Sequence, residues 1–318
     1  MRRLAAFAGV FLALLLPASA FPAAGTTFPP GFPVIADASL GVPVIGFGGA
    51  GPVERAPVIL LHGNNDTPFP TACNPYGDVQ ALADHLLANG YRPSEVWALG
   101  YQGDQCELLA DQTRRSAFAH STVANVPDLR AFVRAVLHYT GAKRVDIVGH
   151  SLGGTLAREW MRQDQAYHLV EHLVAIDSPN HGIVNCSPSP LNYFQLPALG
   201  GFTPNSAVCL EYGAEDTPFL NALNRKETHA PTRYLAIRNA DKSFVYFSAV
   251  DGVFAPVPAE DRTGASHDFS RSAVLLGKRA VNVDLVGQGR YDPILGTAHL
   301  GILNSPETWS LVSEFLAD

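Results

Sequence analysis

The chain contains 318 residues, of which 47% are hydrophobic and 16% charged, and its formal net charge is -7. The charged fraction lies well below the roughly 25% of an average domain, so a chain of this length can bury a large core and is neither disordered nor fibrous. The excess of acidic residues argues against nucleic acid as a partner, because a phosphate-binding protein needs a basic face. None of the four cysteines forms a C-x-x-C pair, so the sequence predicts no zinc site.

The first 20 residues have the pattern of a cleavable signal peptide. Arg2 and Arg3 form a positive region, Ala5–Leu16 is a continuous apolar stretch, and Ala18-Ser19-Ala20 is a small-residue cleavage site. The apolar stretch has 12 residues, fewer than the about 20 that a transmembrane helix needs. We therefore expect cleavage after Ala20 and a mature chain, residues 21–318, that is exported to the extracellular space or the periplasm and is soluble.

Beyond this leader, apolar runs and helical spacing alternate along the chain. Residues 21–55 are rich in proline and glycine and are expected to wrap the surface or add edge strands. The predicted elements are, in chain order, a strand at 58–61, a helix at 79–88, a strand at 96–99, a helix opened by Pro127 and ended by Gly141, a strand at 145–148, a helix at 152–163, strands at 169–176, 233–238 and 281–286, and a helix at 308–316. This alternation predicts a mainly parallel sheet with helices on both faces. No linker divides residues 21–318, so one domain is expected, with an insertion at about 183–230.

Export would place the four cysteines in an oxidising compartment, where an even number usually forms disulfide bonds. Four cysteines allow three connectivities. We favour Cys73–Cys106 and Cys186–Cys209, because each of these pairs brackets one loop region.

The motif with the clearest chemical meaning is Gly149-His150-Ser151-Leu152-Gly153, which lies between a predicted strand and a predicted helix. A sharp strand-to-helix turn would hold Ser151 in a strained conformation, and side chains at the flanking glycine positions would collide with neighbouring backbone. The turn would expose the serine hydroxyl above the carboxyl edge of the sheet. It would also leave the next amides at a helix N-terminus, where they can stabilise an oxyanion. This context predicts that Ser151 is a nucleophile rather than a helix cap.

With this motif, the sequence resembles the α/β-hydrolase superfamily, and within it the secreted bacterial lipases and the extracellular polyhydroxyalkanoate depolymerases. The resemblance covers about residues 56–318 and depends on four segments, which are Leu61-His62-Gly63-Asn64, Gly149–Gly153, Asp177-Ser178-Pro179-Asn180-His181-Gly182 and Ala298-His299-Leu300-Gly301. It implies the α/β-hydrolase fold, with a mainly parallel central sheet flanked by helices and an insertion that resembles a cap or lid. It also implies a serine, an acid and a histidine that follow one another in the chain.

The histidine of this set would be His299. A serine hydroxyl needs an adjacent base at neutral pH, and histidine suits the role because its pKa lies near the working pH. His299 follows the last predicted strand, in a loop with Gly296, and precedes the closing helix. The family carries its base at this place, so the resemblance assigns the role to His299. His62, beside the first core strand, is expected to brace the oxyanion loop instead.

Two aspartates compete for the role of the acid, which orients the histidine and supports its positive charge. Asp241 leaves the carboxyl end of the strand predicted at 233–238, and topology favours it for this reason. Asp251 begins the segment Asp251-Gly252-Val253-Phe254-Ala255-Pro256, which resembles a segment after that strand in many lipases. If residues 244–250 form the core strand instead, Asp251 takes the role, so it stays the alternative acid.

By the same resemblance, the backbone amides of Asn64 and Leu152 would form the oxyanion hole. Together these assignments predict a secreted serine carboxylic-ester hydrolase, similar to a triacylglycerol lipase or esterase, that acts on hydrophobic esters through an acyl-enzyme. No metal or organic cofactor is needed for this chemistry. Apolar residues of the insertion, such as Phe194 and Phe202, would either pack a capping subdomain or meet the substrate.

Two alternative functions stay open at this point. The same catalytic residues would serve an extracellular polyhydroxyalkanoate depolymerase, for example one that degrades polyhydroxybutyrate. A non-catalytic, hydrolase-like binding protein is the alternative from another class, and the intact serine, histidine and acid argue against it. In either enzyme the expected partner is a hydrophobic ester, lipid or polyester, and the chain is expected to be a monomer.

Overall fold

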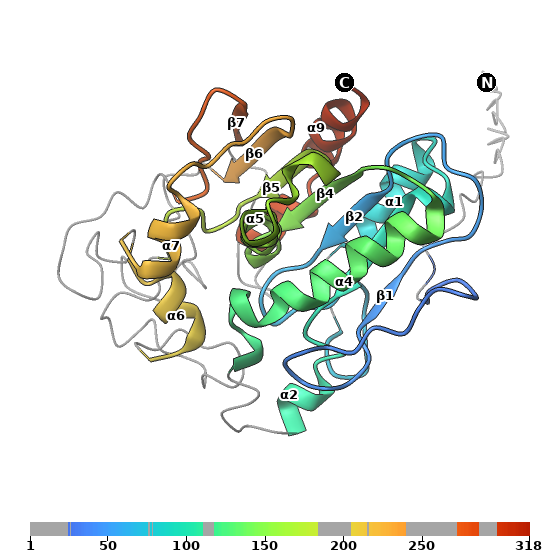
Figure 1. The fold of residues 1–318 in the computed structure, drawn as a ribbon, viewed down its shortest axis with the longest axis horizontal. Coiled ribbons are helices and arrows are strands. Elements are labelled where there is room, and N and C mark those ends of the chain that lie inside the picture. Colours follow the sequence, from blue (N-terminus) through green and yellow to red (C-terminus); the bar gives the residue numbers. More distant parts are fainter. Residues whose placement is uncertain are drawn as a thin grey trace, which may run out of the picture.

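The computed structural model describes residues 25, 27–75, 77, 79–110, 118–183, 205–214, 216–239, 272–285 and 298–318. Seven strands of this part of the chain form one sheet in the order β1-β3-β2-β4-β5-β6-β7. The pairs are parallel except for the edge pair β1 and β3, which is antiparallel. The predicted fold class, a mainly parallel sheet flanked by helices, is confirmed (Figure 1).

Each of the six predicted strands coincides with an observed one to within two residues. The strands are β1 (Ile45–Phe47), β2 (Val58–Leu61), β3 (Val96–Gly100), β4 (Val145–His150), β5 (Val170–Ile176), β6 (Arg233–Asn239) and β7 (Ala280–Leu285). The helices are α1 (Gln80–Ala88), α2 (Cys106–Ala110), α4 (Thr122–Thr140), α5 (Leu152–Asp164), α6 (Ala207–Tyr212), α7 (Pro218–Leu223), α8 (Ala298–Leu303) and α9 (Pro306–Ala317), with short 3-10 turns at Pro93–Glu95 and Ala166–Leu169. None of the described helices is long and apolar enough to cross a lipid bilayer.

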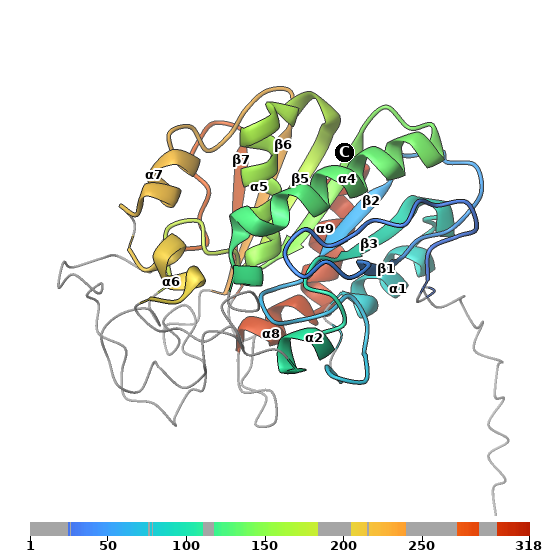
Figure 2. The same cartoon turned by 60° about the horizontal axis from the view of Figure 1, so that its bottom comes forward.

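The sheet separates two apolar cores, which explains why its central strands are continuous apolar runs. Along β2, Ile59 and Leu61 enter the core under α4 and α5, whereas Val58 and Leu60 enter the core under α1 and α9. A strand that is buried on both faces carries no polar alternation. Figures 1 and 2 show α4 and α5 together on one face of the sheet, with α1 and α9 on the other.

The proline- and glycine-rich segment before β2 supplies the edge strand β1, one of the two roles expected for it. It also covers part of the first core with aromatic rings. The Phe32 ring lies 5.0 Å from that of Trp97 and 5.6 Å from that of Phe132 on α4.

Helix α4 begins at Thr122, so the prediction that Pro127 opens it is wrong. The reason is a cap from a distant part of the chain. The buried carboxylate of Glu211 accepts hydrogen bonds from the backbone N–H groups of Thr122 (2.7 Å) and Val123 (3.3 Å), and from the Ser121 hydroxyl. A carboxylate at these otherwise unpaired donors stabilises the first helical turn. Burial raises the pKa of Glu211, and the hydrogen bonds from Ser121 and Thr122 oppose this shift.

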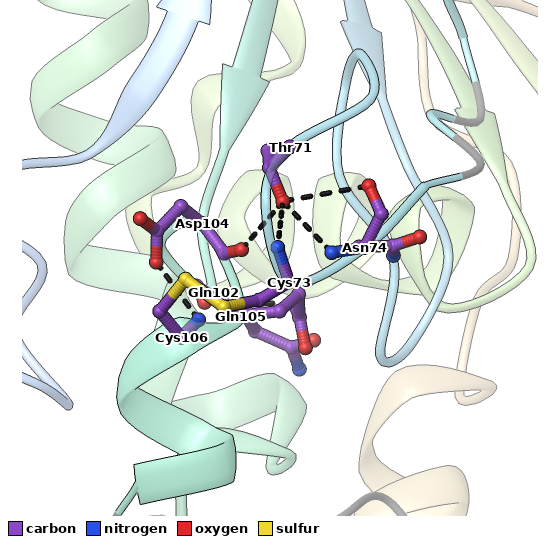
Figure 3. The surroundings of a disulfide bond; sticks show 7 residues. All are labelled: Thr71, Cys73, Asn74, Gln102, Asp104, Gln105 and Cys106. Atoms are coloured by element: carbon purple, nitrogen blue, oxygen red, sulfur yellow. Dashed lines mark hydrogen bonds between the residues drawn. A yellow bond between two sulfur atoms is a disulfide. The ribbon is translucent and has the colours of Figure 1, made fainter.

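A disulfide bond joins Cys73 to Cys106, in agreement with the favoured pairing (Figure 3). It ties the loop after β2 to the start of α2. Next to it, the Thr71 hydroxyl donates to the carbonyl oxygen of Asp104 (2.8 Å). Cys209 is also disulfide-bonded.

Several sequence predictions fall outside the described residues and stay predictions. They are the signal peptide at residues 1–20, the alternative core strand at 244–250, residues 184–204 of the insertion, and Cys186, the expected partner of Cys209.

Two buried carboxyl groups connect the N-terminal segment to α4. Asp37 and Asp128 are each 1% exposed. Asp37 Oδ1 accepts the N–H groups of Ser39 and Leu40, and Asp128 Oδ1 accepts that of Ala38, each at 2.8 Å. Burial, together with the nearby charge of Asp37, raises the pKa of Asp128 to about 7.

Asp128→Asn is therefore expected to stabilise the protein at pH 8 more than at pH 5. Between the ordinary pKa of 3.8 and the folded value of about 7, the folded state binds more protons, so the free energy of unfolding falls as the pH rises through this window. Asparagine keeps an oxygen for the Ala38 N–H and does not ionise. We therefore expect the substitution to raise the free energy of unfolding at pH 8 by about 1–3 kcal/mol. Thermal unfolding of both proteins at the two pH values measures this difference. An advantage that is equal at both pH values would contradict it.

Candidate active site

The predicted serine turn has the expected backbone geometry. Strand β4 ends at His150, α5 begins at Leu152, and Ser151 between them has φ 51° and ψ -123°. A positive φ is uncommon for a residue other than glycine and persists only where the surroundings enforce it. Here the Ser151 N–H donates to the carbonyl oxygen of Ile176 on the neighbouring strand (2.9 Å), and Ser151 is 4% exposed.

The close approach of the backbone at this turn requires Gly153. A Cβ atom at this position would lie 2.6 Å from the carbonyl oxygen of Leu61 and 2.7 Å from that of His62. Real Cβ contacts are essentially never this short. The first turn of α5, with the Leu152 amide, therefore packs directly against the loop that follows β2 and carries Asn64.

That loop is fixed by aromatic and polar contacts. The His62 ring stacks on Tyr101 at 4.1 Å, and the Tyr101 hydroxyl donates to the His62 carbonyl oxygen (2.6 Å). The Asn64 side-chain oxygen accepts from Gln102 Nε2 (3.2 Å) and lies 2.7 Å from Nδ1 of the buried His120. These contacts fit the expected bracing role of His62, whereas the part played by His120 is not apparent from the sequence.

The first turn of α5 is also tied to α6, which lies within the insertion. The Tyr212 hydroxyl lies 2.5 Å from Thr122 Oγ1 and donates to Thr155 Oγ1 at 2.7 Å. The Thr155 hydroxyl in turn donates to the Leu152 carbonyl oxygen (2.9 Å). A continuous chain of hydrogen bonds thus links α4, α6 and the residue after Ser151.

His299 lies in the first turn of α8, not in the loop that the sequence predicts. Ile302 and Leu303 of this helix enter the apolar core and hold it against the sheet. Nε2 of His150 lies 2.9 Å from the carbonyl oxygen of His299, and the two imidazole rings are 4.5 Å apart. The residue that precedes Ser151 is therefore in direct contact with His299.

His299 also contacts Asp177, the residue that follows β5, the strand next to β4. Asp177 follows Ile176, whose carbonyl oxygen accepts the Ser151 N–H, and its Oδ2 lies 2.7 Å from His299 Nδ1. Asp177 is 2% exposed and His299 7% exposed. His299 thus contacts the chain at the carboxyl ends of two neighbouring strands, at His150 in β4 and at Asp177 after β5. Ser151 lies between these two contacts, because it follows His150 and its N–H donates to Ile176.

Asp177 is a site residue to which the sequence analysis gives no role, although it quotes the segment that begins with it. The available signal is its place as the first residue after a buried strand that neighbours the serine strand. Asp241 and Asp251, the acids that the sequence favours, lie outside the described residues, so their roles stay predictions.

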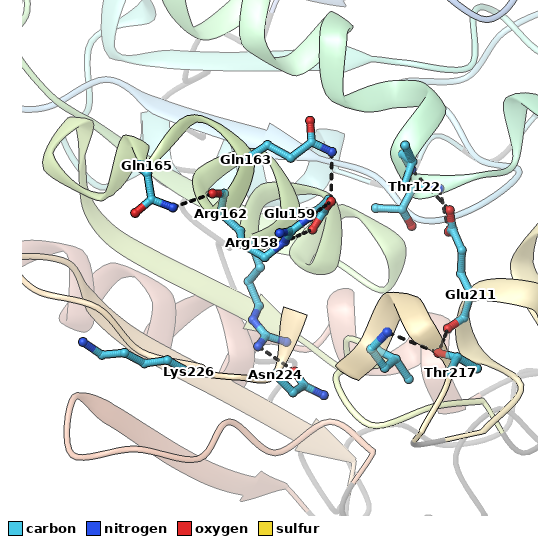
Figure 4. A network of polar contacts seen from close by, with 12 residues as sticks. Thr122, Arg158, Glu159, Arg162, Gln163, Gln165, Glu211, Thr217, Asn224 and Lys226 are labelled. Carbon is cyan, nitrogen blue, oxygen red and sulfur yellow. Dashed lines mark hydrogen bonds and ion pairs between the residues drawn. The ribbon is translucent and has the colours of Figure 1, made fainter. Parts of the chain in front are cut away.

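The segment after Asp177 is held from behind by a buried arginine. Arg158 of α5 is 4% exposed and donates to the side-chain oxygens of Asn180 (2.8 Å) and Asn224 (2.9 Å). Figure 4 shows the contact of Arg158 with Asn224, whose amide in turn donates to the Asn180 carbonyl oxygen (2.8 Å). Burial lowers the pKa of Arg158. This network fixes the loop that presents Asp177 and has no local sequence signature.

The sheet topology and the strained serine turn are those of an α/β-hydrolase. Residues 55–268 match the family described as lipase (class 2), and the chain belongs to that family. The protein is therefore a hydrolase of the lipase and esterase type, which acts on carboxylic esters. The predicted enzyme class is confirmed.

Solved structures agree with the fold. The mature form of lipase BlEst2 from Bacillus licheniformis superimposes with a TM-score of 0.54 and 18% identity, over 86% of this chain and 97% of that one. Lipase B from Aspergillus fumigatus gives a TM-score of 0.51 and 17% identity, over 86% of this chain and 56% of that one.

Proposed function

We propose that this chain is a secreted serine lipase or esterase that hydrolyses hydrophobic carboxylic esters through an acyl-enzyme. The observation that carries the proposal is the contact of His299 with both segments that flank the strained Ser151. A serine hydroxyl beside an imidazole, which is itself held by a carboxylate, is an arrangement that activates the hydroxyl as a nucleophile.

In the proposed reaction, Ser151 Oγ attacks the ester carbonyl carbon while His299 takes the hydroxyl proton. The negative charge on the carbonyl oxygen is stabilised by the backbone N–H groups of Asn64 and Leu152, which belong to the two segments that pack together at Gly153. His299 then gives the proton to the departing alkoxide. Water, activated by the same imidazole, attacks the acyl-enzyme and releases the acid.

The acid beside His299 keeps the imidazole in the tautomer that accepts the serine proton and stabilises the imidazolium. Asp177 makes this contact in the described structure. Asp241 and Asp251, which the sequence favours, are the alternative candidates for this acid.

Exposed apolar side chains support a hydrophobic substrate. Phe118, four residues before α4, and Val123, in the first turn of α4, are 55% and 44% exposed, and Leu210 on α6 is 52% exposed. The hydrogen bonds between Glu211 and the start of α4 hold these two helices together. Large exposed apolar residues that lie close together are typical of surfaces that meet apolar ligands.

We also propose export, with residues 1–20 removed and residues 21–318 forming one domain. The Cys73–Cys106 bond supports this proposal, because disulfide bonds persist in oxidising compartments.

Labelling with a fluorophosphonate, followed by peptide mapping, tests the proposal. We expect one covalent adduct, on Ser151, that is lost in Ser151→Ala and kept in the control Ser310→Ala, which changes an exposed serine of α9. The same sample should hydrolyse emulsified triacylglycerol and p-nitrophenyl esters. An adduct on another residue would contradict the assignment of the nucleophile. Preferential hydrolysis of amorphous polyhydroxybutyrate would instead identify the substrate as a polyester.

A further inference from the structure

A concave site lies at the opposite end of the sheet from Ser151. It is a groove of about 580 Å³ between the loop 224–230, which leads from α7 to β6, and the turn 276–279, which precedes β7. It therefore lies at the amino ends of β6 and β7. Ser151 and Asp177 follow the carboxyl ends of β4 and β5, so the groove is separate from the candidate active site.

Four cations line this groove, namely Arg225, Lys226, Lys278 and Arg279, and all four are exposed. Within the ranges that the structure describes, none of the four forms an ion pair. Six other arginines each pair with a carboxylate, and they are Arg92, Arg130, Arg144, Arg162, Arg233 and Arg238. A gathering of unneutralised cations is notable in a chain whose formal net charge is -7.

The one acid among the groove residues does not neutralise these cations but holds the groove together. The Glu227 side chain is 6% exposed, accepts the backbone N–H of Leu276 (2.7 Å) and lies 3.4 Å from Nε2 of His181. The turn also approaches the loop closely at Gly277, whose φ is 131° and where a Cβ atom would collide with Thr228. The backbones of the two walls are thus fixed relative to each other, so the positions from which the cations project are set before any ligand arrives.

A smaller cavity next to the groove adds little net charge, because Arg162 pairs with Glu159 and the Glu227 carboxylate interacts with Arg158. This cavity shares Lys226 and Glu227 with the groove and is also lined by Arg158, Arg162 and His229. Figure 4 shows Lys226 on the same side of α5 as Arg158. The hydrogen bonds of Arg158 go to amide oxygens, and the nearby Glu227 carboxylate supplies its counter-charge.

We propose that this groove binds a phosphate ester. Guanidinium groups match phosphate oxygens through paired hydrogen bonds, and lysine ammonium groups supply further charge. The groove, of about 580 Å³, has room beside a phosphate for an organic group, so the proposed ligand is a phosphate ester rather than inorganic phosphate. Leu276, which is 48% exposed, lines the groove and offers that part an apolar contact. The phosphate belongs to a soluble ester or to a phospholipid headgroup.

Calorimetry of the mature protein with glycerol 3-phosphate at low ionic strength tests the proposal. We expect saturable binding that weakens at least about tenfold in Lys278→Gln/Arg279→Gln and in Arg225→Gln/Lys226→Gln. Arg134→Gln/Lys143→Gln, which removes two exposed cations of the α4 region, should keep wild-type affinity, and so should Ser151→Ala. All groove variants should keep the wild-type rate of p-nitrophenyl ester hydrolysis, which also reports that they are folded.

Sedimentation with phosphatidylglycerol and phosphatidylcholine vesicles distinguishes the two sources of phosphate. Binding to phosphatidylglycerol alone, lost in both groove variants, would identify a lipid headgroup as the ligand. Binding of glycerol 3-phosphate with the same dependence on the groove would identify a soluble ester. The proposal is overturned if neither probe binds, or if the groove variants and the Arg134→Gln/Lys143→Gln control lose affinity equally.

Discussion

Replacement of His299 by alanine is expected to lower the rate of ester hydrolysis by about 10⁴–10⁶-fold. In the proposed mechanism, the imidazole takes the Ser151 proton, returns it to the leaving group and activates the water of the second step, so each chemical step would lose its proton carrier. Labelling of Ser151 by a fluorophosphonate should disappear as well, because the hydroxyl is unreactive without a base. Initial rates on p-nitrophenyl butyrate and gel fluorescence measure the two effects.

His168→Ala is the matched control, since it removes an exposed imidazole near the end of α5 and should leave the rate unchanged. Thermal unfolding of both variants separates a loss of chemistry from a loss of structure. If His299→Ala kept more than about one hundredth of the wild-type rate while folded, the base would have to be another residue.

Asp177→Asn is expected to reduce kcat by about 10²–10⁴-fold with little change in KM. The carboxylate oxygen lies 2.7 Å from His299 Nδ1. In the proposed mechanism it selects the tautomer and supports the positive charge that develops on the ring. An amide at this position removes the negative charge and can present an N–H where an acceptor is needed. Because Asp177 acts through His299, substrate binding should be spared, and a kcat and KM measurement shows this division.

Asp241→Asn and Asp251→Asn complete this experiment. If Asp177 supports the imidazole, these two variants should retain most of the wild-type kcat. Near-wild-type turnover of Asp177→Asn, together with loss of turnover in one of the other two, would return the role to the acid that the sequence favours.

Features with local causes were predictable from the sequence. The strand β2 is a continuous apolar run because both of its faces are buried, and the run marks its two ends without error. The serine turn was equally predictable, since the glycines that permit it lie two residues to either side of Ser151. The order of strand, motif and helix was therefore enough to place Ser151 at an edge of the sheet.

Features with distant causes were not predictable. Helix α4 begins five residues before Pro127 because Glu211, 89 residues away from Thr122, caps it. The contact of Asp177 with His299 spans 122 residues and depends on which strands are neighbours. Neither interaction leaves a pattern in the sequence near the residues that it positions.

The hydrogen-bond chain through Glu211 and Tyr212 also sets a limit for protein engineering. The pair lies within the insertion, yet Glu211 caps the start of α4 and Tyr212 reaches α5, the helix that follows Ser151. A truncated variant, made to widen access for bulky substrates, should therefore keep residues 206–212 intact. Grafting the insertion of another enzyme into this scaffold would have to reproduce both side chains at the same junction.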